Sequence, residues 1–211
     1  MSLKIFHNYS PNFNPIKRHT NQIKFLIFHY TGMKSEPEAI NRLTNIQSRV
    51  SSHYLIKGNG EIIVLVPDLY VAWHAGKSYW KRFKHLNKNS IGIEISNPGH
   101  QNSYKNFSKN QIKSISKLTR HLTSKYKIKP KNILGHSDIA PSRKQDPGEK
   151  FPWRLLAKKK IGIWHSIPDI ILKKNRLKSI DFKLEKCFFQ NLLKIGYVFN
   201  NSENLRKKKV L

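Results

Sequence analysis

The sequence contains a single cysteine, Cys187, and no apolar run long enough to cross a bilayer. One cysteine excludes an intramolecular disulfide bond. A transmembrane helix needs about 20 consecutive apolar residues, and no stretch of the 211 residues approaches that length. Residues 1–7 also lack the sustained apolar core of a secretory signal. We therefore expect a cytoplasmic protein without a transmembrane segment.

Acidic residues are scarce: 12 Asp and Glu stand against 40 Lys and Arg, which gives a net charge of +28. Such a charge attracts nucleic acid, anionic lipid or acidic polymers. The basic residues are dispersed along the chain, so a composition that favours lysine explains the charge without any partner. We keep a cationic nucleic-acid-binding protein as a minor alternative.

Two potential metal ligands, His136 and Asp146, lie ten positions apart within residues 135–148. The apolar run that ends at Leu134 predicts a buried strand with His136 at its carboxyl end. The prolines of the segment exclude a continuous helix, so the chain must loop back after this strand. A loop of this kind can aim both side chains at one point.

A catalytic zinc ion usually takes three protein ligands and keeps one position for water. The third candidate is His29, which directly follows the apolar run 25–28. A further apolar run, residues 90–95, is interrupted by one carboxylate, Glu94. Burying a lone acid is costly unless a nearby metal or bound water holds it. These positions are therefore compatible with a metal site.

Each of these residues also has an ordinary interpretation. A histidine at a strand end is commonly a hydrogen-bonded core residue, and Asp146 before Pro147 is typical of a turn. Glu94 can form a salt bridge with one of the many basic residues, and Lys144 can be an ordinary solvated lysine. Spacing alone does not decide between the two interpretations.

Five separated motifs resemble zinc-dependent N-acetylmuramoyl-L-alanine amidases of the type 2 family, in the order seen there. This family includes the AmpD-like recycling amidases and is related to phage lysozyme-type amidases and peptidoglycan recognition proteins. The resemblance covers roughly residues 5–160. The motifs are FHYTG (28–32), SHYLI (52–56), AWHAG (72–76), IGIE (91–94) and the segment GHSDIAP…RKQDPG…FPW (135–153).

The resemblance implies that His29, His136 and Asp146 bind one zinc ion per chain. It implies that Glu94 acts on the water at the metal and that Lys144 stabilises the negative charge that develops during the reaction. The expected reaction is hydrolysis of the amide between the lactyl group of N-acetylmuramic acid, or its anhydro form, and L-alanine. The expected partners are peptidoglycan fragments, either muropeptides or anhydro-muropeptides.

We assign substrate binding to Tyr30, Trp73, His74 and Arg143. Trp73 and His74 lie in an expected loop, and aromatic groups with a polar edge suit the sugar face of a glycopeptide. Core packing of Trp73 is an equal alternative, and His74 has the alternative of supporting the metal ligands. For His53 we favour a structural role over that of a fourth ligand, because a catalytic zinc ion needs its open position.

The patterns predict an α/β fold with a mixed central β-sheet flanked by helices, as in type 2 amidases and peptidoglycan recognition proteins. Residues 108–126 form an amphipathic helix that begins with a capping box and joins parallel strands. Residues 35–49 predict a surface helix, residues 151–160 a closing helix, and the turn at 57–60 a hairpin between 52–57 and 61–66.

Two parts are expected in the chain: an amidase catalytic domain in residues 1–160 and a basic helical extension in 161–211. Residues 154–211 carry 15 Lys and Arg against 4 acids. Residues 181–197 predict a helix that resembles part of small peptidoglycan-binding modules.

A non-catalytic peptidoglycan-recognition module is the main alternative to an amidase, although the complete set of catalytic residues argues against it. The sequence does not decide between anhydro and ordinary muramyl substrates.

Overall fold

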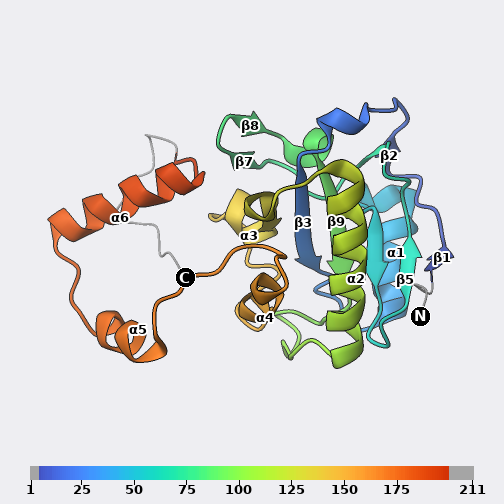
Figure 1. Ribbon diagram of the computed structural model, residues 1–211. Coiled ribbons are helices and arrows are strands. Elements are labelled where there is room, and N and C mark those ends of the chain that lie inside the picture. The colour runs from blue at the N-terminus through green and yellow to red at the C-terminus, as the bar shows by residue number, and fades with distance from the viewer. Residues whose placement is uncertain (1–4, 200–211) are drawn as a thin grey trace.

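The computed structural model describes residues 5–199, and its centre is one mixed β-sheet (Figure 1). The strand order across the sheet is β1-β5-β4-β9-β3-β10, and all neighbours are parallel except the hairpin pair β4 and β5. The strands of this sheet are β1 Ile5–His7, β3 Phe25–Tyr30, β4 Tyr54–Ile56, β5 Ile62–Val64, β9 Ser90–Ile95 and β10 Ile133–Gly135. Two antiparallel ribbons lie outside it: β2 Phe13–Asn14 with β6 Val71–Ala72, and β7 Tyr79–Trp80 with β8 Phe83–Lys84.

Helices cover the sheet and continue beyond it. They are α1 Glu36–Thr44, α2 Lys109–Tyr126, α3 His136–Ile139, α4 Trp153–Lys158, α5 Asp169–Arg176 and α6 Phe182–Ile195. No helix within residues 5–199 is both long and apolar enough to cross a membrane. The mixed sheet flanked by helices confirms the predicted fold class.

The crossover helix α2 forms as its sequence predicts. Ser108 is its N-cap: the Ser108 hydroxyl accepts a hydrogen bond from the Gln111 backbone N–H at 3.0 Å, and the Gln111 side chain accepts one from the Ser108 N–H at 2.9 Å. This capping box satisfies two backbone donors that a helix start leaves without partners. Helix α2 joins β9 to β10, which lie parallel on either side of β3.

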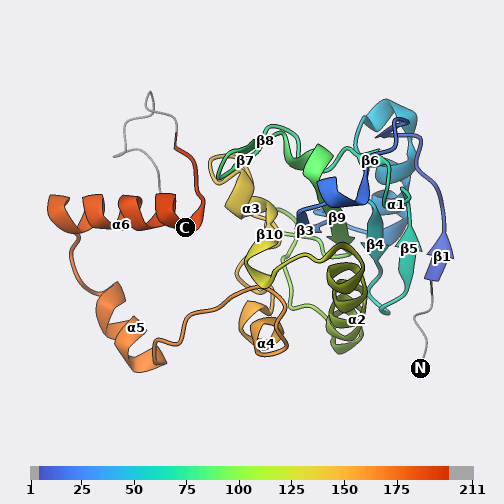
Figure 2. The same ribbon diagram turned by 45° about the horizontal axis from the view of Figure 1, so that its top comes forward.

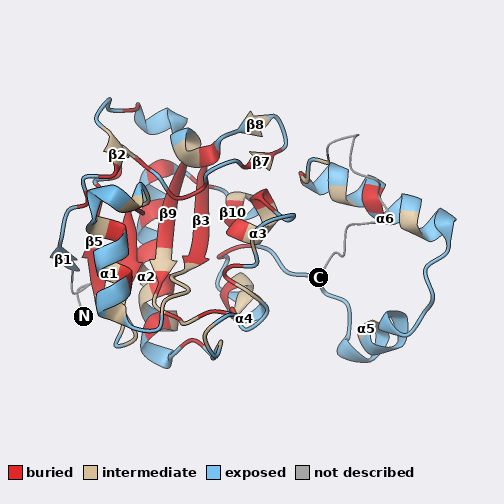
Figure 3. Cartoon of the chain, turned by 180° about the vertical axis from the view of Figure 1, so that it is seen from behind, coloured by how far each residue is buried: buried red, intermediate tan, exposed pale blue. Residues whose placement is uncertain are grey.

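The core is buried on both faces of the sheet (Figure 3). On one face, Phe28 and Ile93 pack with Ile115 of α2. On the opposite face, Leu43 of α1 packs with Leu55, and Figures 1 and 3 show the two helices on opposite sides. Because β3, β9 and β10 are parallel, their carboxyl ends meet at one edge of the sheet.

Helix α1 is shorter than the helix predicted for residues 35–49. It ends at Thr44, because the Asn45 side chain accepts a hydrogen bond from the Gln47 N–H at 2.8 Å and starts a turn of 3-10 helix, Ile46–Ser48. The predicted hairpin is confirmed as the antiparallel pair β4 and β5. Helix α4 forms inside the predicted range 151–160.

The extension after residue 160 leaves the sheet domain and returns to it near β7 and α3 (Figure 2). The Tyr197 hydroxyl donates a hydrogen bond to the Asp138 carboxylate at 2.5 Å, and the Lys81 N–H donates one to the Gly196 carbonyl at 2.7 Å. The rings of Trp80 and Tyr197 lie 5.0 Å apart. The predicted helix 181–197 appears as α6, whereas α5 was not predicted. The basic residues 206–209 lie outside the described residues.

Candidate metal centre

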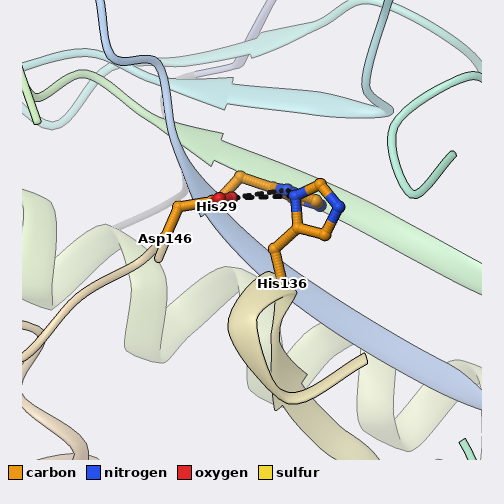
Figure 4. A group of neighbouring side chains, drawn as sticks. All are labelled: His29, His136 and Asp146. Carbon is orange, nitrogen blue, oxygen red and sulfur yellow. Dashed lines mark hydrogen bonds and ion pairs between the residues drawn. The ribbon is translucent and has the colours of Figure 1, made fainter. Parts of the chain in front are cut away.

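Three buried side chains converge at the carboxyl edge of the parallel strands (Figure 4). His29 lies near the end of β3, His136 directly follows β10, and Asp146 lies in the loop after α3. The Nδ1 atoms of His29 and His136 are 2.9 Å apart, and each lies 3.0 Å from Oδ2 of Asp146. The structure therefore brings together the three ligands expected from the sequence.

The chemistry of these three atoms fits a zinc ion. Two imidazole nitrogens and one carboxylate oxygen form a donor set that catalytic zinc sites use. Adjacent ligands of a tetrahedral zinc ion, bonded at about 2.0–2.1 Å, lie about 3.3 Å apart, which is within a few tenths of an ångström of the separations observed here. Three protein ligands leave one position of a tetrahedron for water or substrate.

The protonation states of the cluster also favour metal binding. Burial, followed by the neighbouring His136, lowers the pKa of His29 to about 4. Burial alone would raise the pKa of Asp146, but the contacts with His136 and His29 outweigh it and hold this pKa below its usual range. A metal needs a neutral imidazole and an ionised carboxylate. At neutral pH, His29 and Asp146 are in these forms.

Glu94 and Lys144 lie beside the cluster. Glu94 of β9 is the register partner of His29 in β3. Its Oε2 atom is buried and has no hydrogen-bond partner among the described residues. Burial, and then the charge of Asp146, raises the pKa of Glu94 well above its usual value, while the charge of Lys144 lowers it. The half-buried Lys144 thus acts electrostatically on Glu94 as well as on His29.

Tyr30 and Trp73, two of the residues assigned to substrate binding, are partly open to solvent. The Trp73 side chain is 37% exposed, so its ring is available to a ligand. The Tyr30 hydroxyl lies 2.9 Å from Nδ1 of His100. Sequence reasoning missed His100 and Tyr104, which lie close to Gly148 in the loop that carries Asp146. Neither residue belongs to a motif, so no sequence signal indicated them.

His74 and Arg143 are engaged with the protein itself. His74 is buried, and its Nδ1 lies 3.0 Å from Nε2 of His29. The Arg143 guanidinium donates hydrogen bonds to the carbonyls of Ala75 at 2.6 Å and Lys77 at 2.7 Å. His74 thus contacts the side of the His29 ring that faces away from the cluster. Arg143 stabilises the loop at residues 75–77 through its hydrogen bonds. Direct substrate contact by either residue stays a prediction.

His53 lies outside the three-ligand cluster. Its Nδ1 accepts a hydrogen bond from the Gly92 N–H at 3.0 Å, and its Nε2 lies 3.1 Å from the Tyr70 carbonyl oxygen. Burial, and then the charge of Arg18, lowers the pKa of His53 to about 3. These contacts fit the structural role expected for this residue.

An α/β sheet that presents two imidazoles and a carboxylate at one point, with a further acid and a lysine beside them, is an arrangement that hydrolases with a metal site use. The sequence pattern of the N-acetylmuramoyl-L-alanine amidase family matches residues 19–149. Because this match spans more than half of the chain, the protein belongs to that family. The resemblance inferred from the five motifs is thereby confirmed.

Individual relatives agree with this membership. The N-acetylmuramoyl-L-alanine amidase AmiD of Escherichia coli is 42% identical over 155 residues, which cover 68% of this chain and 55% of AmiD. The 1,6-anhydro-N-acetylmuramyl-L-alanine amidase AmpD of Haemophilus influenzae is 33% identical over 162 residues, which cover 68% of this chain and 85% of that protein. The chain thus spans only about half the length of some curated relatives it matches.

A solved structure supports the same fold. The E. coli AmiD complex with the substrate anhydro-N-acetylmuramic acid-L-Ala-D-gamma-Glu-L-Lys has a TM-score of 0.76 and 33% sequence identity, and the match covers 90% of this chain and 78% of AmiD. The match to AmiD covers more of this chain than the sheet domain alone. The fold inferred from the sequence is therefore shared with a solved member of the family.

Proposed function

We propose that this protein is a zinc-dependent amidase that hydrolyses the bond between the lactyl group of N-acetylmuramic acid, or its anhydro form, and L-alanine in peptidoglycan fragments. The observation that carries the proposal is the convergence of His29, His136 and Asp146 beside Glu94, whose buried Oε2 has no hydrogen-bond partner within residues 5–199. Membership of the amidase family supports the choice of reaction.

A zinc ion held by the three ligands would polarise the amide carbonyl and lower the pKa of a water molecule. Two neutral imidazoles and one carboxylate leave such a site with a net charge near plus one, which preserves its Lewis acidity. The burial of all three side chains excludes bulk water from their surroundings and strengthens the electrostatic interactions there.

Glu94 transfers the proton in this mechanism. Its buried Oε2 has no competing partner among the described residues, so it can accept a proton from the attacking water and deliver it to the leaving nitrogen. A general base works best when its pKa lies near the operating pH. Burial shifts the pKa of Glu94 upward, toward that range.

Lys144 stabilises the negative charge that develops on the amide oxygen. Its positive charge already acts on both Glu94 and His29 in the folded protein. A preplaced charge in a buried site costs no reorganisation at the moment of reaction, so it lowers the barrier more effectively than solvent can.

Tyr30 and Trp73 are the proposed substrate contacts, because both side chains are partly open to solvent. The half-exposed Trp73 ring offers an apolar face for a sugar. The E. coli AmiD structure contains an anhydro-muramyl peptide, which supports acceptance of anhydro substrates here. We further propose that residues 161–211 form a basic helical extension with a reduced peptidoglycan-binding role, and that the protein acts in the cytoplasm.

The test uses the zinc-loaded full chain and two substrates, an anhydro-muramyl tripeptide and its ordinary muramyl counterpart. We expect release of the peptide that begins with L-alanine and one zinc ion per chain by elemental analysis. His29→Ala should lose both, whereas His121→Ala, at an exposed histidine of α2, is the matched control and should lose neither. A zinc-replete protein that binds these substrates and leaves them intact would instead be a recognition module.

A further inference from the structure

We propose that His74 and Ser90 form a hydrogen-bond relay that fixes the tautomer of His29 and thereby prepares it to bind metal. The inference rests on the proposed zinc site and assigns positioning roles to two side chains that do not reach the metal. It develops the second of the two interpretations given for His74, support of the metal ligands.

The relay is a chain of short contacts in the interior. Nε2 of His29 lies 3.0 Å from Nδ1 of His74, and Nε2 of His74 lies 3.1 Å from Oγ of Ser90. The Ser90 hydroxyl lies 2.6 Å from the carbonyl oxygen of Leu86. His29, His74 and Ser90 are all buried, so water does not compete for these contacts.

The Leu86 carbonyl, at the end of the relay, sets the direction of every hydrogen bond in it. A carbonyl oxygen only accepts, so the Ser90 hydroxyl donates to Leu86. Ser90 then accepts from Nε2–H of His74, which leaves Nδ1 of the neutral His74 ring as an acceptor. That atom accepts from Nε2–H of His29. When zinc is bound, the lone pair of His29 is consequently on Nδ1, the atom that faces His136 and Asp146.

The backbone around His74 holds its ring in place. A Cβ atom at Gly92 would lie 2.4 Å from Cγ of His74, so the ring packs directly on the backbone of β9. The backbone N–H groups of His74 and Ala75 donate to Oδ1 of Asn87 at 3.1 and 2.7 Å. Only glycine at position 92 leaves room for this ring, so the sequence IGIE provides both the cleft for His74 and the acid Glu94.

The next residue of the same segment orients the second imidazole. Nε2 of His136 lies 3.2 Å from the carbonyl oxygen of Ala75. Nη2 of Arg143, which only donates, also lies 3.5 Å from this nitrogen, but the carbonyl oxygen is nearer and only accepts, which favours the proton on Nε2 of His136 and the lone pair on Nδ1. Arg143 donates to the same carbonyl at 2.6 Å. Residues 74 and 75 therefore prepare both histidines for one metal ion.

A relay of this kind should be visible in metal affinity. Groups that hydrogen-bond to the far nitrogen of a ligating histidine typically contribute about 10- to 100-fold to metal affinity. We expect Ser90→Ala to weaken zinc binding by about that factor, because Nε2–H of His74 loses its acceptor and the ring can adopt the other tautomer. His74→Phe should cause a loss at least as large.

The experiment is a competition titration of zinc between the metal-free full chain and a chelating dye. Ser116→Ala is the matched control: Ser116 is also buried, but its hydroxyl donates to Ile112 within α2 and should leave zinc affinity unchanged. Thermal unfolding of the metal-free variants checks that each one folds. Unchanged affinity in folded Ser90→Ala and His74→Phe would overturn the relay, whereas a wild-type protein that binds no zinc would overturn the zinc site itself.

A second measurement needs no variant. Nitrogen NMR of histidine-labelled, zinc-loaded protein distinguishes the two neutral tautomers of each ring. The relay predicts that His29 and His74 both carry their proton on Nε2. A proton on Nδ1 of His74 would contradict it even if the variants failed to fold.

Discussion

Replacing Glu94 with glutamine is expected to stabilise the metal-free protein while removing most of its activity. Oε2 of Glu94 is buried without a hydrogen-bond partner among the described residues, and burial raises the pKa of this carboxyl well above its usual value. Folding at neutral pH therefore requires either proton uptake or partial burial of a charge that Lys144 compensates only in part. Glutamine has nearly the same shape and carries no charge.

Glutamine also leaves a polar atom at this site, so the gain is only the extra cost of burying a charge over a neutral polar group, which is on the order of 1–3 kcal/mol for a carboxyl whose pKa is raised by burial. For a chain of this length, each kcal/mol corresponds to about 2–4 °C in melting temperature, so we expect an increase of about 2–12 °C near pH 8. Loss of a positioned proton-transfer group should lower turnover by about 100- to 10,000-fold. Zinc content should remain at the wild-type level.

The pH dependence of the stability difference between wild type and Glu94→Gln shows whether the charge of Glu94 causes it. A raised pKa in the folded state means that wild-type stability is fully present below the unfolded pKa and declines as pH rises from there toward the folded pKa. Glutamine does not titrate, so its advantage should be absent below about pH 4.5, the ordinary Glu value, and should grow at higher pH. The assay is thermal unfolding in a chelator from pH 4 to 8, with the exposed Glu38→Gln as control. An advantage that does not change with pH would refute this reasoning.

Three further predictions concern the metal and the packing. Asp146→Asn should lose most of its zinc affinity, measured by competition titration. A chelator should lower the melting temperature of the wild type, because bound zinc stabilises the folded state, but should not change that of this variant, which binds little zinc. Tyr197→Phe removes the hydrogen bond to Asp138 and should cost about 1–3 kcal/mol in denaturant unfolding, with exposed Tyr9→Phe as control. Leu122→Ala, at a fully buried position of α2, should cost about 2–5 kcal/mol; a smaller loss would mean that the core refills the cavity.

Local signals in the sequence predicted the elements that depend on nearby residues. The capping pair Ser108 and Gln111 marked the start of α2, and the turn at residues 57–60 marked the hairpin. The apolar runs before His29 and His136 indicated strands, and parallel strands bring their carboxyl ends to one edge. These inferences needed only periodicity and turn chemistry.

Local sequence patterns could not predict contacts between side chains that are far apart in the sequence. Trp73 and His74 are neighbours in one motif, yet Trp73 is 37% exposed and His74 is 6% exposed. The distinction depends on Gly92 of β9, which leaves room for the His74 ring. The bond between Tyr197 and Asp138 joins two parts of the chain that no sequence pattern connects. Burial and pairing of this kind are set by tertiary packing.

The most direct test of the account is to locate zinc by anomalous X-ray scattering in crystals of the zinc-loaded protein. The account predicts one strong peak within bonding distance of Nδ1 of His29, Nδ1 of His136 and Oδ2 of Asp146. A peak at other residues, or none at these three in crystals grown with excess zinc, would contradict it.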